Sequence, residues 1–239
     1  MISSINYNVA WSRMNLCAPD MWHVWRILEP YVKIAEKRLE IGAGMFPKFS
    51  VKGTHFLDTS KHAIAELTRR GGKGVVMTVE QSPPFQKDFF DLVGAFEVLE
   101  HLEKPERAIQ GVAQVLKQGG LFILSVPMNP HYWSSWDVFA GHVQRFEAQH
   151  LNAILEKGGF QVEHCYVLWK LAKKRFFSWF MRLAGSAPLH FPSFFFFLYN
   201  YLVLPYAWFG RTFSRSSHYH SLQHIPQDST SVLVVCRKQ

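Results

Sequence analysis

Residues 38–58 read RLEIGAGMFPKFSVKGTHFLD. The apolar run over 38–41 predicts a short strand that leads into Gly42-Ala43-Gly44, where two glycines allow the backbone to turn tightly beneath a ligand. A second strand is predicted over 55–57, and Asp58 stands at its end. A carboxylate at that position can accept hydrogen bonds from both hydroxyls of a ribose. The stretch therefore predicts the first unit of an α/β sheet that holds an adenosine-type ligand.

The rest of the chain alternates helices and strands around this unit. An amphipathic helix is predicted over 20–36, with Asp20 as a candidate cap and Pro30 near a break. The further predicted elements are helices over 60–70, 105–117 and 147–157 and strands over 74–79, 90–96, 121–126, 160–168 and 231–236. This order predicts an α/β fold, a Rossmann-like, doubly wound, mostly parallel seven-stranded sheet with helices on both faces. Ligands of such sheets bind beyond the carboxyl ends of the strands.

Five segments, in this order along the chain, carry a family resemblance: Glu40-Ile41-Gly42-Ala43-Gly44, Asp58-Thr59-Ser60, residues 82–85 followed by 90–93, residues 96–102 (FEVLEHL), and residues 115–121 (VLKQGGL). Together they resemble class I S-adenosylmethionine-dependent methyltransferases, particularly the group related to ubiquinone-biosynthesis O-methyltransferases. The resemblance covers roughly residues 36–168 and the final strand.

The resemblance implies a set of residues that bind S-adenosylmethionine: Glu40, Gly42, Ala43 and Gly44 at the methionine end, Asp58 and Thr59 at the ribose, Glu80 and Gln81 beside the adenine, and Phe96 at the lip of the fourth strand. Phe46 stands where the family usually has a third glycine. Gly44 and Asp58 are also closer in sequence than the roughly 20 residues usual in such units, so the first crossover helix is expected to be shortened. A nicotinamide-dependent dehydrogenase remains an alternative for the glycine turn.

Candidate catalytic residues lie in two segments, Glu97-x-x-Glu100-His101 and residues 141–146 (GHVQRF). A hydroxyl acceptor needs help in losing its proton, and His101, His142 or Glu97 is expected to provide it. The pattern also resembles small-RNA 2′-O-methyltransferases, which implies a divalent metal ion held by Glu97, Glu100, His101 and His142. The alternative is that His101 and Glu97 only shape the pocket or cap the next helix.

Two other polar groups have open interpretations. Asp137 and Arg145 are either further pocket residues or a surface ion pair. His218, His220 and His224 lie in a polar loop, HYHSLQH, whose spacing suits either a metal site or a solvated loop.

Residues 170–215 form a basic and aromatic segment. No Asp or Glu occurs from His164 to Gln227, and seven Lys and Arg residues there account for most of the net charge of +8. No charge occurs from 183 to 210, but three prolines leave only residues 193–204 uninterrupted, which is too short to cross a bilayer. We expect short helices that lie at a membrane surface. A lid over the active site or a homodimer interface are the alternatives, and nucleic acid is a weaker partner for this charge.

The predicted organisation is an N-terminal helical segment (1–35), a methyltransferase domain (36–168 and 229–239) and a hydrophobic, basic helical insertion (169–228). Cys17, Cys165 and Cys236 are scattered, which suits a reducing, cytoplasmic compartment, with peripheral attachment to the inner face of the membrane as an extension. The expected activity is methyl transfer to oxygen on a small or lipid-linked acceptor. The alternative is a non-catalytic S-adenosylmethionine-binding membrane adaptor.

Overall fold

A computed structural model describes residues 11–12, 14–81, 84–170 and 217–239, and the expectations for 171–216 lie outside them. The centre of the structure is one eight-stranded sheet in the order β3-β2-β1-β4-β5-β8-β6-β7. The strands are β1 (Arg38–Ile41), β2 (His55–Asp58), β3 (Lys73–Val76), β4 (Phe90–Phe96), β5 (Leu116–Pro127), β6 (Phe160–Lys170), β7 (Ser217–Tyr219) and β8 (Ser229–Lys238). The predicted Rossmann-like sheet is confirmed.

The direction of the strands changes at the C-terminal strand. The pairs β1–β2, β1–β4, β2–β3 and β4–β5 are parallel. Strand β8 enters between β5 and β6 and is antiparallel to both. The short strand β7 pairs antiparallel with β6 and adds an edge that the sequence did not predict. The carboxyl ends of β1, β2, β4 and β5 therefore meet at one edge of the sheet, where the predicted site lies.

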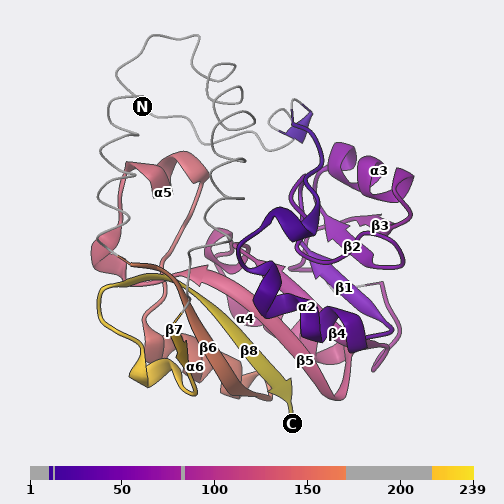
Figure 1. The fold of residues 1–239 in the computed structure, drawn as a ribbon. Helices are drawn as coiled ribbons and strands as arrows, with labels where there is room; N and C mark the ends of the chain where they lie inside the picture. Colours follow the sequence, from indigo (N-terminus) through magenta and orange to yellow (C-terminus); the bar gives the residue numbers. More distant parts are fainter. Residues whose placement is uncertain (1–10, 13, 82–83, 171–216) are drawn as a thin grey trace, which may run out of the picture.

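Helices cover both faces of the sheet (Figure 1). The α-helices are α2 (Trp25–Ile34), α3 (Lys61–Arg69), α4 (Pro105–Val115), α5 (Ser135–Ala140) and α6 (Ala148–Lys157), and the short 3₁₀ turns are η1 (Pro19–Met21), η2 (Leu99–His101), η3 (Pro130–Tyr132) and η5 (Leu222–His224). The apolar sides of α4 and α6 form one large core with the sheet, and α2 packs on the opposite face. Successive residues of a strand face opposite cores: in β4, Leu92 packs in the core under α2, and Val93 packs in the core under α4 and α6.

The crossover from β1 to β2 contains no helix at all, although a shortened one was expected. Phe49, from this crossover, is fully buried and covers the sheet where a helix would otherwise pack. A Cβ added at Gly94 of β4 would come within 2.6 Å of the Phe49 ring, so Gly94 provides the space for that ring. Phe49 also meets Phe96 edge-on, with ring centroids 5.6 Å apart. One aromatic side chain thus closes the core in place of a helix.

Several elements differ from the predicted ones. Helix α2 covers Trp25–Ile34 where a helix over 20–36 was predicted, and α5 was not predicted. Strand β3 ends at Val76, three residues before the predicted end, and β5 begins at Leu116, directly after α4. The predicted insertion, 169–228, starts and ends differently from expectation: β6 runs to Lys170, and the described part after residue 216 contains β7 and η5. Both ends of the insertion are therefore strands of the sheet.

Candidate active site

The glycine turn has the conformation that its sequence requires. Gly42 and Gly44 have φ angles of +68° and +52°, in the left-handed region that glycine adopts without steric cost. A Cβ on Gly42 would lie 2.6 Å from the Val98 side chain, and one on Gly44 would lie 2.6 Å from the Trp11 ring. Both positions therefore need glycine for space as well as for backbone conformation.

Asp58 connects the glycine turn to the start of α3. Its Oδ2 accepts a hydrogen bond from the Gly44 amide at 2.8 Å, and its Oδ1 accepts one from the Ser60 amide at 2.8 Å. Burial raises the pKa of the Asp58 carboxyl, and these amide donors oppose the rise. A carboxylate has about four acceptor positions, and the two bonds leave capacity for ribose hydroxyls.

Glu40 and Ala43 have internal roles that the sequence did not reveal. The Glu40 side chain is almost fully buried and accepts hydrogen bonds from the Lys48 and Phe49 amides at 2.7 and 2.8 Å. These bonds fix the crossover that lacks a helix. Ala43 is buried with Ile64 and Leu67 of α3. The structure thus assigns both side chains to holding the glycine turn in place.

The other residues predicted to bind the cofactor are divided between surface and core. Thr59, Glu80 and Gln81 are exposed, and the last two line a shallow hollow of about 210 Å³ beside α4. Phe96 is the last residue of β4, as predicted, but its side chain is only 8% exposed and packs in the core under α2, edge-on to the Phe49 ring. Its role in cofactor binding stays a prediction.

A larger hollow, of about 350 Å³, is lined by Phe85, Lys87, Gln114 and Val115. Phe85 contacts the rings of His55 and Phe90, which begin β2 and β4. This hollow therefore lies at the amino ends of the strands, away from Asp58 and Glu97, and is not the candidate active site.

Glu97 follows β4 in an unusual backbone conformation. Its φ angle is +53°, which costs a non-glycine residue free energy and is typical of functional positions. Its Oε1 accepts hydrogen bonds from the hydroxyls of Ser125 at 2.7 Å and Ser231 at 3.4 Å. Ser125 interrupts an apolar stretch of β5, which is a signal in the sequence that could have identified it, whereas Ser231 belongs to the polar start of β8.

Asp137 and Arg145 form a buried ion pair, so the surface alternative is wrong. The Arg145 Nε–H donates to Asp137 Oδ1 at 2.7 Å, and both side chains are less than 5% exposed. Ser134 donates to Asp137 Oδ2 through its amide and its hydroxyl, which makes a capping box at the start of α5. Burial raises the pKa of Asp137, but the bonds from His142, Arg145 and Ser134 outweigh it and hold the pKa well below its ordinary value.

His142 is oriented by this ionised carboxylate. Its Nδ1 lies 3.0 Å from Asp137 Oδ1, so the Nδ1–H donates and Nε2 becomes the basic nitrogen. That Nε2 lies 3.8 Å from Glu100 Oε1. The chain Arg145–Asp137–His142 has the arrangement of a base whose tautomer is fixed by a third group.

Glu100 and His101 complete the cluster. Glu100 is fully buried, and neither of its carboxyl oxygens has a hydrogen-bond partner among the described residues. Burial, and next to it the charge of Glu97, raise the pKa of Glu100 well above its ordinary value. His101 donates from Nδ1 to the Gly141 carbonyl at 3.1 Å, and burial with the neighbouring His142 lowers its pKa to about 4. At neutral pH the His101 imidazole is therefore neutral, and the proton of the Glu100 carboxyl is held more tightly than that of an ordinary glutamate.

Three of the four residues predicted to hold a metal ion come together. The potential ligand atoms of Glu100, His101 and His142 lie within 4.8 Å of one another. Glu97 is outside this group, because its carboxylate is turned toward Ser125. The unpartnered oxygens of Glu100 are compatible with a cation, which leaves the three-residue set as a candidate.

Comparison with known proteins agrees with this geometry. Residues 39–165, more than half of the chain, match the model of the methyltransferase domain family. The chain belongs to that family. Its fold is that of class I S-adenosylmethionine-dependent methyltransferases. The glycine turn, Asp58 and the edge formed by β4 and β5 are compatible with that cofactor, since their donors and acceptors are at the carboxyl ends of the strands.

Solved structures share the fold at low sequence identity. A Thermotoga maritima S-adenosylmethionine-dependent methyltransferase, described as a possible histamine N-methyltransferase, aligns with a TM-score of 0.58 and 15% identity over 92% of this chain and 91% of that one. Phosphoethanolamine N-methyltransferase 2 of Haemonchus contortus aligns with a TM-score of 0.56 and 15% identity, over 91% of this chain and 52% of that one. The [4+2]-cyclase SpnF aligns with a TM-score of 0.55 and 16% identity over 90% and 80%.

One curated relative is an uncharacterised protein of Methanocaldococcus jannaschii, 32% identical over 87 residues, which are 36% of this chain and 41% of that protein. The matched part spans about two fifths of that relative. The presence of a cyclase among the similar structures shows that the fold alone does not decide the reaction.

The described part of the chain provides no test of membrane binding. None of its helices combines the length and apolar character needed to span a bilayer. The basic, aromatic residues over 171–215, on which the membrane expectation rests, are outside the described ranges.

Proposed function

We propose that this protein transfers the methyl group of S-adenosylmethionine to a hydroxyl oxygen of a small or lipid-linked acceptor. The observation that supports it is the fixed orientation of His142 by Asp137, at 3.0 Å, beside the carboxyl end of β4. A base held in one tautomer is what an acceptor hydroxyl needs in order to lose its proton. N-methylation of a neutral amine has no such requirement before the transfer.

In this proposal, S-adenosylmethionine supplies a methyl carbon on a sulfonium, and the carbon–sulfur bond breaks as the acceptor oxygen bonds to that carbon. The acceptor proton passes to Nε2 of His142, and the ionised Asp137 stabilises the imidazolium that forms. Asp58 holds the ribose, and the glycine turn allows close approach of the methionine end. The depressed pKa of His101 keeps that imidazole neutral, so it adds no competing positive charge near the base.

A divalent ion on Glu100, His101 and His142 is the second arrangement that the cluster supports. It would lower the pKa of a bound hydroxyl and orient it, in place of the general base. Neutral imidazoles and a carboxyl that loses its proton on binding are suitable ligands. Chelation separates the two arrangements, because only the metal-dependent one loses turnover in excess EDTA and recovers it when Mg²⁺, Mn²⁺ or Zn²⁺ is added.

The test uses tritiated S-adenosylmethionine and lipid and small-molecule extracts as acceptor pools. His142→Gln should lower kcat by about 10²- to 10⁴-fold while leaving the affinity for S-adenosylmethionine unchanged. His150→Gln, at an exposed position on α6, is the matched control. Asp58→Ala should weaken cofactor binding in calorimetry instead. Binding of S-adenosylmethionine without turnover on any pool would favour the non-catalytic adaptor.

The lipid-linked acceptor and peripheral membrane location rest on the sequence of residues 170–215. Seven Lys and Arg residues beside uncharged aromatic runs suit attraction to anionic lipid. In a flotation assay, the chain should rise with vesicles that contain phosphatidylserine and stay at the bottom with neutral vesicles. A chain that stays at the bottom in both cases would remove the membrane part of the proposal and leave the methyl transfer in place.

A further inference from the structure

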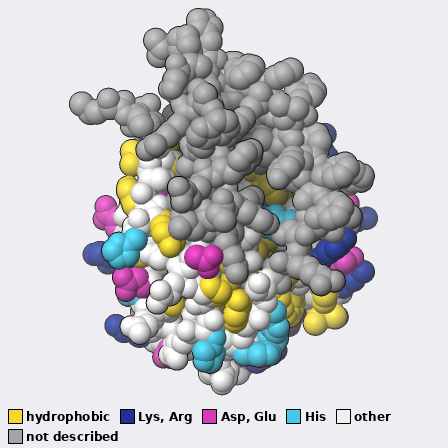
Figure 2. Space-filling view, turned by 60° about the vertical axis from the view of Figure 1, so that its left-hand side comes forward, with side chains coloured by type: hydrophobic (Ala, Val, Ile, Leu, Met, Phe, Trp, Pro, Cys, Tyr) yellow, Lys and Arg dark blue, Asp and Glu magenta, His cyan; other side chains and the backbone are white. Residues whose placement is uncertain are grey.

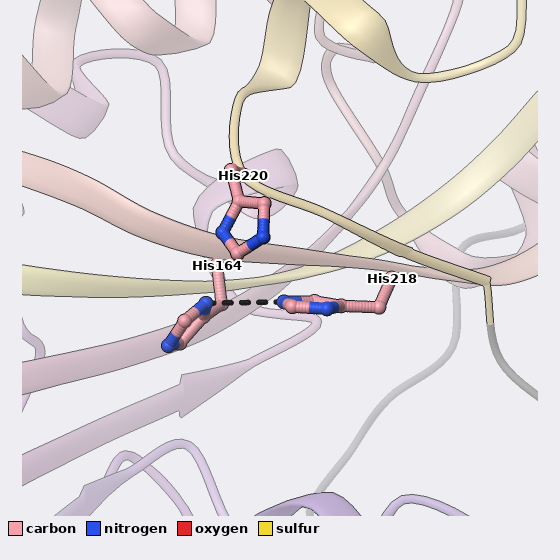
Figure 3. A group of neighbouring side chains, drawn as sticks. All are labelled: His164, His218 and His220. Carbon is pink, nitrogen blue, oxygen red and sulfur yellow. Dashed lines mark hydrogen bonds between the residues drawn. The ribbon is translucent and has the colours of Figure 1, made fainter.

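Three histidines meet on the surface, far along the sheet from the candidate active site. His164 lies on β6, and His218 and His220 lie on and directly after β7. Figure 3 shows the three rings turned toward one another, with His218 Nε2 3.0 Å from His164 Nδ1. Potential ligand atoms of all three lie within 4.8 Å of one another.

The antiparallel pairing of β6 with β7 explains why these residues meet. Cys165 is opposite Tyr219 and Tyr166 is opposite His218, which places His164 across from His220 at the next step of the ladder. Residues two apart on a strand share a face, so His218 and His220 point to the same side. The ring centroids of these two are 4.7 Å apart, and those of His164 and His220 are 5.6 Å apart.

An irregularity in β6 turns the His164 side chain to the side of the sheet on which His218 and His220 lie. The pairing of β6 with β8 shifts register between Val162 and His164, as in a β-bulge. Val162 and Cys165 both pack against the core under α4 and α6, although residues three apart in a regular strand point to opposite faces. In a regular strand His164 would point to the same face as Val162. Bulges commonly redirect a side chain in this way, and here the redirected side chain is an imidazole.

We propose that His164, His218 and His220 form a binding site for a divalent transition-metal ion of the Zn²⁺ type. Imidazole nitrogens bind Zn²⁺ at about 2.0–2.1 Å, so two of them on a tetrahedral ion are about 3.3 Å apart. The separation of 3.0 Å between His164 and His218 is close to that value. His218 and His220 are exposed, so their side chains can adjust to close the remaining distance. The fourth position is left for water or another ligand.

The surroundings of the group favour binding of an ion over a buried structural role. His218 and His220 are exposed and His164 is half-buried, and Figure 2 shows histidine side chains on this face of the molecule. The Tyr166 ring stacks on His218 at 4.8 Å and 22°, which orients that imidazole. His224, which the sequence grouped with His218 and His220, is not part of the cluster; His164, 54 residues before His218, takes its place.

The ion would join β6 to β7, the two strands that flank residues 171–216 in the sequence. Strand β7 has only three residues, and an edge strand of that length has few ladder bonds of its own. A metal ligand from each strand would fix the pairing of β7, since binding to the folded state alone adds to stability. This role does not depend on the proposed methyl transfer.

The experiment measures Zn²⁺ binding to the full chain by competition with a chromophoric chelator. The background carries His101→Gln and His142→Gln, so the cluster at Glu100 cannot contribute. The chain should bind one equivalent of Zn²⁺. His218→Gln and His220→Gln should each weaken binding by more than about 100-fold, because even the loss of an outer-shell partner costs about 10- to 100-fold. His224→Gln should leave binding unchanged.

A second measurement needs no variant of the cluster. Zn²⁺ should protect His218 and His220 of the wild-type chain from modification by diethyl pyrocarbonate, read by mass spectrometry, and should not protect His224. Equal Zn²⁺ affinity in the chain lacking both His218 and His220, or equal modification of His218, His220 and His224 with Zn²⁺ present, would overturn the proposal.

Discussion

Replacing Glu100 with Gln should make the protein more stable at alkaline pH. Glu100 is fully buried, its two oxygens have no donor among the described residues, and its pKa is raised by burial and by Glu97. In the unfolded chain a glutamate loses its proton near pH 4.3. Above that pH the folded state holds one more proton than the unfolded state, so the free energy of unfolding falls as pH rises.

The magnitude follows from the difference of one proton. Each pH unit in which Glu100 is protonated only in the folded state lowers the free energy of unfolding by about 1.4 kcal/mol. His101 has the opposite pH dependence, but only between its ordinary pKa of 6.5 and its folded value of about 4. Between pH 6.5 and 8.5 His101 no longer contributes, and Glu40 and Lys48, whose pKa values lie at about 7 and about 8, are common to both chains and cancel in the comparison with Glu100→Gln. Across this interval, wild type should lose stability relative to Glu100→Gln, by about 1 kcal/mol for each pH unit over which the folded state keeps this proton.

The assay is urea denaturation at intervals of half a pH unit from 6.5 to 8.5, in EDTA so that no cation lowers the pKa of Glu100. The Gln amide keeps the shape of the side chain and carries no charge at any pH of the assay. Glu103→Gln, three residues away and exposed, is the control and should run parallel to wild type. If the Glu100→Gln and wild-type stabilities also run parallel over this interval, Glu100 does not keep its proton in the folded state.

Three further outcomes are expected. Asp137→Asn should lower the free energy of unfolding by about 3–5 kcal/mol in chemical denaturation, because it leaves Arg145 buried without its charged partner. A decrease below about 1 kcal/mol would show that the ion pair does not stabilise the fold. Phe49→Ala should cost about 3–5 kcal/mol, and adding Gly94→Ala to it should cost less than Gly94→Ala alone, because one of the two rings that the new methyl would strike is gone, while the clash with Phe96 remains. His101→Gln should flatten the loss of stability between pH 6.5 and 4, since the unfolded state binds the proton first there; an unchanged slope would show that His101 titrates normally.

The sheet edge at which the carboxyl ends of β1, β2, β4 and β5 meet was predictable, because its position depends on local sequence. Gly42 and Gly44 require left-handed backbone whatever surrounds them, and Asp58 ends a strand that its own apolar residues define. Apolar runs set which segments form strands, and their alternation with helices sets a parallel sheet. Glu100, His101 and His142 were also predicted together, along with Glu97, because their pattern in the sequence resembles that of small-RNA 2′-O-methyltransferases.

The roles of Glu40 and Phe96 were not predictable in this way. Glu40 fits the family's motif in sequence, yet its carboxylate holds the amides of Lys48 and Phe49. Phe96 ends β4 at the edge of the sheet where the predicted site lies, yet its ring packs in the core, edge-on to the ring of Phe49. Both outcomes come from the crossover without a helix, whose packing depends on residues that the motif does not include.

The sequence alone determined the class of fold and the edge of the sheet where ligands bind, because hydrophobic periodicity and glycine turns act over a few neighbouring residues. Only the tertiary structure decided which polar atoms face one another. The ion pair of Asp137 with Arg145, the unpartnered carboxyl of Glu100 and the meeting of His164 with His218 all depend on distances set by strand register and burial. His164 and His218 are 54 residues apart, so no local pattern records their contact, and the burial of the nearby pair Asp137 and Arg145 likewise depends on the packing around it.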